Sequence, residues 1–350
     1  MVKTSELYND LLHPEDEFLH IEVQHITEEQ VKETLTVTKS IELAREAYAK
    51  LSTKQAINPE RAWFTTIQGT SLYCMPSYIM GRKTMAVKIA RSNPDNVDTS
   101  LPSVMATIHV YDASNGRELA QIEAETLTAL RTAASSAVAT HLLARRDATI
   151  LGIFGTGRQA AAHIPAIRQV RDISRVIVYS RDQASREAFA RKASRTYKIQ
   201  VRAADSPEEV VGCSDILVLA TNSNVPLFQG ELVRERTHVN AIGAALPDAR
   251  EIDTTLARRS TIVVDYKPQA LSSYGDILIP LKEGAIRESD IAELGNLLVH
   301  PLVVMKTRDK ITLFKSGGVA VLDAITADFL LSPLRKWKRF PQGVSSQRPE

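Results

Sequence analysis

The hydrophobic and polar residues of this chain follow two different patterns, and each pattern predicts a different kind of structure. In residues 26–52, apolar positions recur every three or four residues, which predicts helices. Residues 61–113 contain β-branched and aromatic runs that predict strands, with a returning strand at 118–122 after a turn. Residues 125–146 then predict a long, alanine-rich helix. The first part of the chain is therefore expected to combine a sheet with helices.

From residue 148 the pattern changes to short apolar runs that alternate with short helical segments. Strands are predicted at residues 148–154, 175–180, 199–203, 215–220, 237–243 and 261–265. Alternating strands and helices are typical of a doubly wound parallel sheet, so we expect an α/β fold of the Rossmann type here. After about residue 310 the chain is expected to return to its first part with a final helix at 318–331.

A glycine-rich turn lies at the end of the first predicted parallel strand. The run Gly155-Thr156-Gly157-Arg158-Gln159-Ala160 follows an apolar strand and opens an alanine-rich helix, which is the order that a dinucleotide site requires. Gly155 permits the tight turn, Gly157 lets the backbone approach a pyrophosphate, and Ala160 lets the helix pack closely on the strand. The phosphates would lie against N–H groups at the start of the helix. The alternative is an ordinary β–α turn.

The end of the second parallel strand indicates which dinucleotide binds. An acidic residue at this place hydrogen-bonds the ribose 2′-hydroxyl of NAD, but the chain has Ser180 followed by Arg181. A guanidinium can bind a 2′-phosphate, so we expect NADPH rather than NADH, unless Asp182 takes the acidic role after a small register shift. Thr221 and Ser223 follow the fourth strand and are predicted to line the same carboxyl edge of the sheet.

Composition and charge narrow the class of protein further. With 350 residues, 44% of them hydrophobic and 24% charged, the chain has ordinary globular values and a length that suggests two domains. The formal net charge of +2 gives no reason to expect nucleic acid or a membrane as a partner, and no apolar run is long enough to span a bilayer. Cys74 and Cys213 form neither a metal pattern nor a disulfide framework, so we expect two thiols, no metal and a cytoplasmic location.

Taken together, the motifs resemble those of the ornithine cyclodeaminase/mu-crystallin family over nearly the whole chain. The matching segments are residues 86–90, 101–103, 127–134, 155–160, 264–265, 275–277 and 314–318. The resemblance implies a homodimer that binds its substrate in a cleft between two domains. It implies a substrate-binding and dimerisation domain of α+β type in residues 1–134 and 312–350, with an NAD(P)-binding Rossmann domain, residues 135–311, inserted in it.

The resemblance also implies which residues contact the substrate and the cofactor. Three cations match its substrate-binding positions: Arg61, Lys88 and Arg131, of which Arg131 also reaches the cofactor. Planar guanidinium groups suit this role because two parallel hydrogen bonds fix the orientation of a carboxylate. Further cofactor contacts are expected at Ser103, Ile242, Ser316, Gly317 and Gly318. For Ser103 the alternative is a plain turn serine.

Lys88 stands out from the residues around it. It lies in the middle of an otherwise apolar strand, so its side chain must point into a cleft or across a buried interface. Arg131 interrupts the apolar face of its helix in the same way, and the alternative for each cation is a structural salt bridge. A partly desolvated lysine beside two arginines should have a lowered pKa. Lys88 is therefore the expected catalytic residue, which exchanges a proton with the substrate nitrogen.

One position departs from part of the family. The cyclodeaminases and alanine dehydrogenases carry an aspartate where this chain has Ala245, and they continue with Pro-Gly-Lys where it has Pro247, Asp248 and Ala249. Cyclodeamination needs a carboxylate to move protons while ammonia leaves, whereas reduction of a preformed imine needs orientation, electrostatics and a hydride. The chain thus resembles the mu-crystallin and ketimine reductase branch, and a part for Asp248 in proton transfer stays open.

The expected function is NADPH-dependent reduction of a cyclic or N-substituted α-imino acid to the L-amino acid. Δ1-pyrroline-2-carboxylate and Δ1-piperideine-2-carboxylate are candidate substrates. Two alternatives remain: an amino-acid dehydrogenase or cyclodeaminase acting on ornithine, lysine or alanine, and a mu-crystallin-like protein that binds a small ligand together with NADPH. Trp63 and Phe64 either reshape the pocket or pack in the core and at a sheet edge, and the size of the substrate stays open.

Overall fold

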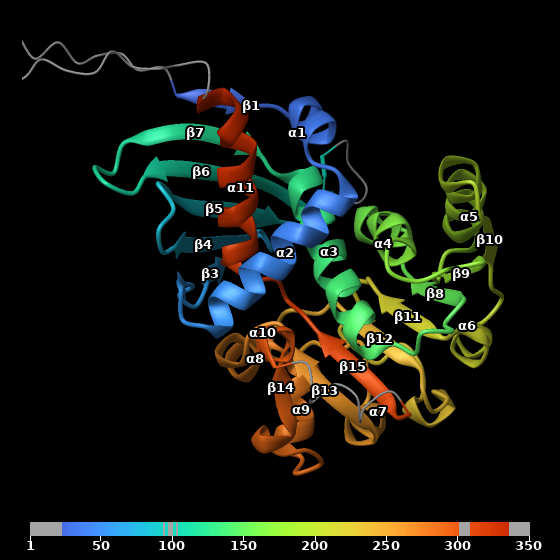
Figure 1. Ribbon diagram of the computed structural model, residues 1–350. Coiled ribbons are helices and arrows are strands. Elements are labelled where there is room, and N and C mark those ends of the chain that lie inside the picture. Colours follow the sequence, from blue (N-terminus) through green and yellow to red (C-terminus); the bar gives the residue numbers. More distant parts are fainter. Residues whose placement is uncertain (1–22, 94, 97–100, 103, 301–308, 336–350) are drawn as a thin grey trace, which may run out of the picture.

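The computed structural model describes residues 23–93, 95–96, 101–102, 104–300 and 309–335 of the chain. These residues form two sheets, one of seven strands and one of eight, and helix α3 (Glu125–Leu143) lies between them (Figure 1). Most side chains of α3 are buried because the helix packs against elements of both sheets. Residues on α3 are therefore well placed to reach a site between the two sheets.

The seven-stranded sheet occupies the first part of the chain. Its strands are β1 (Gln24–Ile26), β2 (Ala56–Ile57), β3 (Ala62–Thr65), β4 (Ser71–Ile79), β5 (Thr84–Ser92), β6 (Val104–Asp112) and β7 (Glu118–Glu123). They run in the order β1-β7-β6-β5-β4-β2, with β3 paired to β4. Every pair is antiparallel except β1 with β7.

Helices cover one face of this sheet. Helix α11 (Ala320–Arg335) packs on β4, β5 and β6, and α2 (Val37–Ser52) packs on α11 and α3, with α1 (Glu28–Thr34) beside β7. Alternate residues of a strand point to the same face, so Ala86 and Ile108 are buried on this side. Lys88 lies two residues after Ala86, and the same alternation therefore points it inward.

The eight-stranded sheet is parallel throughout. Its strands are β8 (Ile150–Phe154), β9 (Arg175–Tyr179), β10 (Gln200–Ala203), β11 (Ile216–Leu219), β12 (His238–Ala241), β13 (Ser260–Val264), β14 (Ile291–Glu293) and β15 (Ile311–Lys315). Their order is β10-β9-β8-β11-β12-β15-β13-β14. The chain order reverses between β8 and β11, and the carboxyl ends of two such strands open the crevice in which parallel sheets bind ligands.

Helices connect the parallel strands. They are α4 (Arg158–Arg168), α5 (Gln183–Tyr197), α6 (Pro207–Cys213), α7 (Thr254–Arg259), α8 (Lys267–Ser273), α9 (Gly275–Lys282) and α10 (Leu294–Val299), with short 3₁₀ turns η2 (Gly230–Leu232) and η3 (Glu288–Asp290). The strands β8 and β11 are almost wholly buried between these helices, which explains why they appear in the sequence as continuous apolar runs.

The structure confirms the α/β fold class and all six predicted parallel strands, and it adds β14 and β15. The expected return of the chain to its first part at residue 312 is wrong by a few residues. Residues 312–315 lie in β15, between β12 and β13, and the chain leaves the parallel sheet only after Lys315. A short apolar run next to a helix has no periodicity that assigns it to one sheet. The division into two domains stays a prediction.

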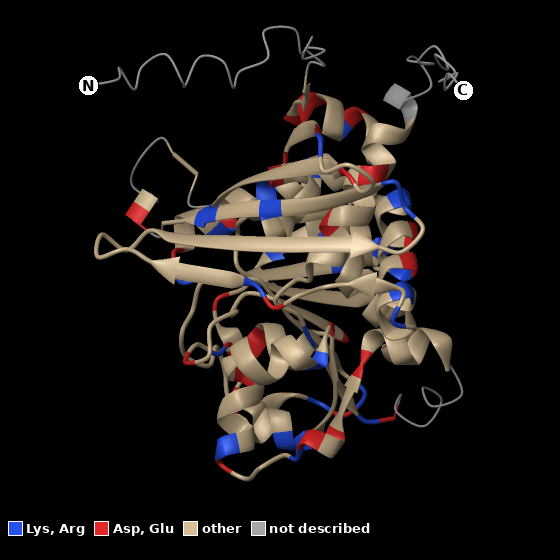
Figure 2. Ribbon diagram, turned by 90° about the vertical axis from the view of Figure 1, so that its left-hand side faces the viewer, with Lys and Arg blue, Asp and Glu red and all other residues tan. Residues whose placement is uncertain are grey.

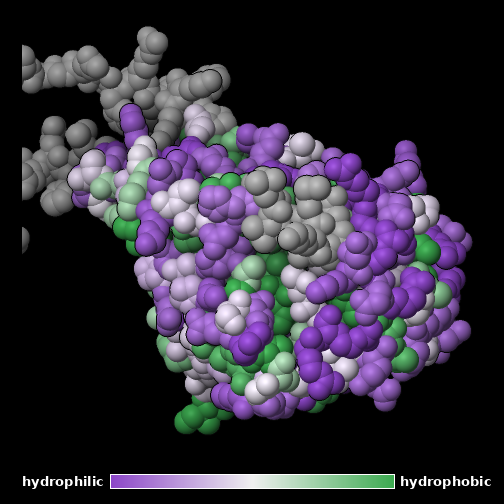
Figure 3. Space-filling view, turned by 60° about the horizontal axis from the view of Figure 1, so that its bottom comes forward, coloured by the Kyte–Doolittle hydropathy of each residue, from purple (hydrophilic) through white to green (hydrophobic). Residues whose placement is uncertain are grey.

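The surface carries apolar side chains at one edge of the seven-stranded sheet. Trp63 and Phe64 on β3 are 43% and 57% exposed, so the core packing expected as one alternative is not found. In Figure 2 long stretches of this sheet are free of charge, whereas Lys, Arg, Asp and Glu gather on helices and loops. Figure 3 shows another face, on which hydrophilic side chains surround a hydrophobic recess. Within the described ranges, no helix has the length and hydropathy needed to cross a bilayer.

Candidate active site

Two of the three predicted cations meet at one buried carboxylate. Lys88 Nζ lies 2.8 Å from Asp323 Oδ2, and Arg131 Nε lies 3.1 Å from Asp323 Oδ1. All three side chains are buried, and they come from β5, α3 and α11. We call this group the cation cluster. Because two cations share one carboxylate, it carries an excess of positive charge where the sheet and the two helices meet.

Burial and neighbouring charges act on Lys88 in opposite directions. Desolvation has the largest effect and lowers the pKa of the ammonium, and the guanidinium groups of Arg131 and Arg61 lower it further. Asp323 raises it, and the resulting pKa of Lys88 is about 8. An amine whose pKa lies this close to neutral pH exchanges protons readily, as a general acid or base must. The lowered pKa expected from the sequence is thus present in the structure.

Arg61 approaches the cation cluster from the loop before β3. Its Nη2 donates to the carbonyl oxygen of Ala245, and its guanidinium carbon lies 5.7 Å from the centre of the Tyr73 ring. Its Nε is buried and has no hydrogen-bond partner within the described part of the chain. Arg61 also lies close enough to influence the pKa of Lys88, so the three predicted cations face one region. An anionic ligand would satisfy such a donor.

The loop between β15 and α11 lies directly over Arg131. Gly318 has a φ of +83°, and a Cβ atom there would lie 2.3 Å from Arg131 Nη1. Asp265 holds this loop, because its Oδ2 accepts hydrogen bonds from the hydroxyl of Ser316 at 2.7 Å and the N–H of Gly318 at 3.0 Å. The hydroxyl of Tyr274 donates to the same carboxylate at 2.9 Å. A glycine at 318 therefore lets the backbone close over the guanidinium.

A second buried group of charges fixes the loops after β11 and β12. Glu251 accepts hydrogen bonds from the N–H and hydroxyl of Thr221, at 2.9 and 2.7 Å, and from the N–H of Gly243 at 2.7 Å. Asp276 accepts from the N–H of Glu251 at 2.7 Å and lies 2.7 Å from Lys315 Nζ. Lys315, Asp276 and Glu251 are fully buried, and burial raises the pKa of Glu251. We call these three residues the loop clamp.

The glycine-rich turn after β8 has the shape that a pyrophosphate requires. Gly155 has a φ of +105°, and a Cβ atom there would lie 2.4 Å from the carbonyl oxygen of Ala220. A Cβ atom at Gly157 would meet nothing within 4 Å, which leaves open space at the turn. Helix α4 begins at this turn with no side-chain cap and no acidic residue in its first turn, so its N–H groups suit an anion. The residues present fit a dinucleotide.

The residues after β9 are those expected beside the 2′-position of the adenosine ribose. Asp182 is the N-cap of α5, and its carboxylate accepts a hydrogen bond from the N–H of Ser185 at 2.7 Å. The alternative acidic role of Asp182 would therefore compete with the cap of a helix. Ser180 donates to the carbonyl of Asp182 at 3.0 Å, and Arg181 is exposed beside it. The guanidinium of Arg181 is accessible to a phosphate.

Three further residues of the turn after β8 were predicted to contact the cofactor. Thr156 and Gln159 are half-buried, and Gln159 Oε1 has no hydrogen-bond partner among the residues that the structure describes. Arg158 is exposed and forms an ion pair with Glu125 at the start of α3. Gln159 thus keeps an acceptor that a ligand could use, whereas Arg158 is paired with a carboxylate of its own protein.

The remaining predicted residues differ in how closely they approach the crevice. Ile242 is buried at the end of β12, and its N–H donates to the carbonyl of Leu219. Ser223 lies in the loop after β11, and its hydroxyl donates to the carbonyl of Val225 at 2.7 Å. Asp248, considered for proton transfer, is exposed. Ser103 lies outside the described residues.

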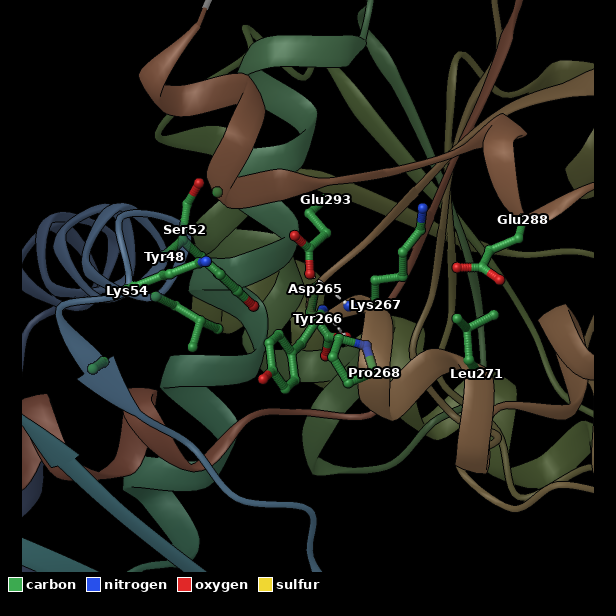
Figure 4. A pocket seen from close by; sticks show the side chains of 13 residues that line it. Tyr48, Ser52, Lys54, Asp265, Tyr266, Lys267, Pro268, Leu271, Glu288 and Glu293 are labelled. Atoms are coloured by element: carbon green, nitrogen blue, oxygen red, sulfur yellow. Dashed lines mark hydrogen bonds between the residues drawn. The ribbon is translucent and has the colours of Figure 1, made fainter.

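A cavity of about 440 Å³ lies on the other side of Asp265. Figure 4 shows Tyr48, Ser52 and Lys54 on one side of it, and Tyr266 and Lys267 on the other. None of the predicted substrate or cofactor residues lines it. Among the described residues, no group of His, Cys, Asp and Glu side chains is placed to hold a metal ion. The cation cluster and the glycine-rich turn, rather than this cavity, therefore define the candidate site.

The carboxylates of both charged groups were not predicted. Asp323 interrupts an apolar run at the start of the final helix, just as Lys88 interrupts an apolar strand, and this signal could have found it. Glu251 lies in a polar loop, where a carboxylate is ordinary. Its role depends on contacts with Thr221 and Gly243 that no spacing in the sequence reveals.

A dinucleotide-binding turn beside a buried excess of cations defines a nucleotide-dependent enzyme that acts on a small anion. The chain belongs to the ornithine cyclodeaminase/mu-crystallin family, whose model matches residues 22–335. The resemblance found in the motifs is thereby confirmed, and it covers the cation cluster, the loop clamp and the glycine-rich turn.

Relatives and solved structures agree with this assignment. The chain is 35% identical over 326 residues to a Δ1-pyrroline-2-carboxylate reductase of Bacillus cereus, with 92% of this chain and 98% of the relative covered. It superposes on the Thermococcus litoralis Δ1-pyrroline-2-carboxylate reductase in complex with NADH and L-proline with a TM-score of 0.86, at 35% identity, covering 90% and 98% of the two chains. An archaeal alanine dehydrogenase dimer with bound NAD gives a TM-score of 0.83 at 29% identity, covering 90% and 97%.

Proposed function

We propose that this chain is an NADPH-dependent reductase of cyclic α-imino acids, with Δ1-pyrroline-2-carboxylate and Δ1-piperideine-2-carboxylate as substrates. The products are the L-amino acids proline and pipecolate. The observation that carries the proposal is the cation cluster, in which Lys88 and Arg131 share one carboxylate and Arg61 faces them. Such a site has more positive charge than its own residues neutralise, and an imino acid brings the missing carboxylate.

The two arginines hold the substrate. Arg131 uses Nε to bind Asp323 and so leaves its two Nη groups for a carboxylate. Arg61 adds a second guanidinium, which the carbonyl of Ala245 holds from one side. Two planar donors fix the plane of the substrate carboxylate and therefore of the conjugated C=N bond. The loop after β12, whose Ala245 carbonyl accepts a hydrogen bond from Arg61, and the loop at Gly318, which lies over Arg131, approach these two guanidinium groups from the parallel sheet.

Lys88 transfers the proton. Its pKa of about 8 keeps it largely protonated at neutral pH while making the proton easy to release. The ammonium donates this proton to the imine nitrogen, and solvent later restores it. When bound, the reduced nicotinamide supplies the hydride for the imine carbon. Residues of the glycine-rich turn, Gly155 and Gly157, would hold its pyrophosphate.

The residues at position 245 and after it favour reduction over cyclodeamination. Ala245 has no group that accepts a proton, and Asp248 is exposed rather than turned into the cluster. Loss of ammonia from a diamino acid needs a carboxylate to manage the protons on the amines. The carboxylates that the site does contain, Asp323 and Asp265, are engaged with cations or with backbone and hydroxyl donors.

The cofactor of this chain is NAD(P)H, and we infer NADPH in particular. The solved relatives hold NADH or NAD. Here the ribose position has Ser180 and an exposed Arg181, and the neighbouring Asp182 caps α5. A guanidinium without a competing carboxylate favours a 2′-phosphate. The expected cytoplasmic location stays a prediction.

The test is direct turnover with a matched pair of cofactors. Purified protein should oxidise NADPH when Δ1-pyrroline-2-carboxylate or Δ1-piperideine-2-carboxylate is added, with a higher kcat/KM than for NADH. Arg181→Ala should remove most of that preference and leave NADH turnover unchanged. Release of ammonia from ornithine or lysine without imine reduction would contradict the proposal. So would tight binding of these imino acids with no oxidation of NADPH.

A second copy of the chain is the proposed partner. Trp63, Phe64 and Val104 expose apolar area on the seven-stranded sheet, and a solved relative is a dimer. Burial of this area against a symmetry-related copy would explain why aromatic residues face water here. Light scattering coupled to gel filtration should give twice the mass of one chain, and Phe64→Glu should give a monomer.

A further inference from the structure

We propose that Asp323 is the positioning residue of this site: its two carboxylate oxygens separate Lys88 and Arg131 into a proton donor and an anion clamp. The inference rests on the proposed reduction. The geometry that carries it is the sharing of one carboxylate, because Oδ2 lies 2.8 Å from Lys88 Nζ and Oδ1 lies 3.1 Å from Arg131 Nε. Each oxygen therefore serves one cation.

The contact with Arg131 orients its guanidinium. Asp323 engages Nε, and Gly318 lies over Nη1, so the guanidinium is held from its side and from above. An arginine has five N–H donors in one plane, and those on its two Nη atoms form the fork that binds carboxylates. Fixing Nε therefore sets the direction in which this fork points.

The contact with Lys88 keeps its amine charged. Among the described residues, three charged groups act on this lysine: Arg131 from α3, Arg61 from the loop before β3, and Asp323 from α11. Both arginines and burial favour the neutral amine, and Asp323 opposes them. If Asp323 lost its charge, two guanidinium groups would face a desolvated ammonium, and Lys88 would give up its proton to solvent. A neutral lysine cannot donate a proton to the imine nitrogen.

The same helix provides a matched control. Asp328 lies five residues after Asp323 on α11 and is also buried. Its Oδ1 accepts a hydrogen bond from the hydroxyl of Thr84 at 2.7 Å, and its Oδ2 lies 3.0 Å from Arg82 Nη1. It thus joins α11 to the end of the seven-stranded sheet through an ion pair, as Asp323 does, but this ion pair is with Arg82 rather than with a cation of the site. A purely structural role for Asp323 would make the two aspartates equivalent.

The experiment is the pH profile of imine reduction by Asp323→Asn and Asp328→Asn. In the wild type, kcat/KM should fall above the Lys88 pKa of about 8. Asp323→Asn should move this limit to lower pH by about 1–3 units, and KM should rise as Arg131 loses its orientation. Asp328→Asn should keep the wild-type limit even where it unfolds at lower temperature. An unchanged limit in Asp323→Asn would overturn the proposal.

Asp323→Glu keeps the charge and lengthens the side chain, so it separates charge from position. It should retain the upper pH limit while kcat falls, and full wild-type kinetics in this variant would also overturn the proposal. Nitrogen NMR of the lysine amines, without NADPH or substrate, measures the Lys88 pKa directly, with Lys88→Arg to assign the signal. If the wild type reduces no imino acid, the proposed function fails. The pKa difference between Asp323→Asn and the wild type still decides the role of Asp323.

Discussion

The cation cluster and the loop clamp are both buried groups of three charged side chains. They differ in the sign of the excess charge and in how many of their hydrogen-bonding groups have partners. The cation cluster has two cations, Lys88 and Arg131, for one carboxylate. The loop clamp has two carboxylates, Glu251 and Asp276, for the single ammonium of Lys315. Glu251 and Asp276 accept hydrogen bonds from backbone N–H groups. In the cation cluster, by contrast, Arg131 and Lys88 each have N–H donors left over after their contact with Asp323, among the residues that the structure describes.

The use of hydrogen-bonding groups distinguishes the candidate binding site from the support around it. Both groups consist of charges that are costly to bury, so burial alone does not distinguish them. The loop clamp is complete without a ligand, because its carboxylates are satisfied by N–H groups and by Lys315. We propose that an anionic ligand completes the cation cluster. An excess of charge whose hydrogen-bonding groups are still free therefore marks the candidate site, whereas an excess that backbone N–H groups satisfy marks the support that holds the loops.

The largest effect is expected from Lys88→Met. It removes the proton donor, so kcat/KM for imine reduction should fall by about 1,000-fold. The melting temperature should not fall. The folded pKa of Lys88, about 8, lies below its usual 10.5, so the unfolded chain binds more protons between these values. Stability then rises with pH across that window, and charged Lys88 destabilises the fold at neutral pH. A lower melting temperature with retained turnover would contradict this assignment.

Lys315→Met is expected to do the opposite. It leaves Asp276 and Glu251 buried without their cation, so the free energy of unfolding should fall by about 3–5 kcal/mol. Urea denaturation of this variant and of Lys88→Met measures the contrast. The fraction of Lys315→Met that remains folded at low temperature should still bind NADPH. If the two variants unfolded at the same urea concentration, the distinction between a site and a scaffold would not hold.

A smaller effect is expected from Gly318→Ala. The new Cβ atom would lie 2.3 Å from Arg131 Nη1 and displace the guanidinium, so kcat/KM should fall by about 100-fold. Gly81 provides the control, because its φ of +82° matches the +83° of Gly318 and a Cβ atom there meets nothing within 4 Å. Gly81→Ala should share the backbone strain, about 1 kcal/mol, and keep its activity. Equal kcat/KM in both variants would show that the reaction does not depend on the position of the Arg131 guanidinium.

Much of the fold could be predicted because its signals are local. The strand before Gly155 and the helix after it are adjacent in the chain. The alternation of predicted strands with predicted helices after residue 148 distinguishes the parallel sheet from the sheet before it. β15 could not be placed in this way. Its five residues stand next to the final helix in sequence, but they pair with β12 and β13, which lie far away along the chain. Such pairing follows from the completed sheet rather than from any local pattern.

The sequence predicts the cations of the candidate site but not the contacts that hold them together. Lys88 and Arg131 were found because they match substrate-binding positions of the family and because a charge in an apolar run is costly unless it is paired. Their partner Asp323 comes from a helix almost 200 residues after Arg131. Pairing over such a distance has no signature in spacing, and the same holds for the contact of Arg61 with the carbonyl of Ala245. The cations were thus predictable as candidates, and Asp323 could have been found by the same rule, but the pairing between them could not.

The most direct measurement is a crystal structure with NADP and pyrrole-2-carboxylate, a planar analogue of the imino acid that cannot be reduced. We expect its carboxylate within hydrogen-bond distance of the guanidinium groups of Arg61 and Arg131, and its ring on the side of Lys88. Asp323 should keep both of its contacts. A carboxylate bound elsewhere, with Lys88 and Arg131 still joined only to Asp323, would contradict an anion site built from these three cations.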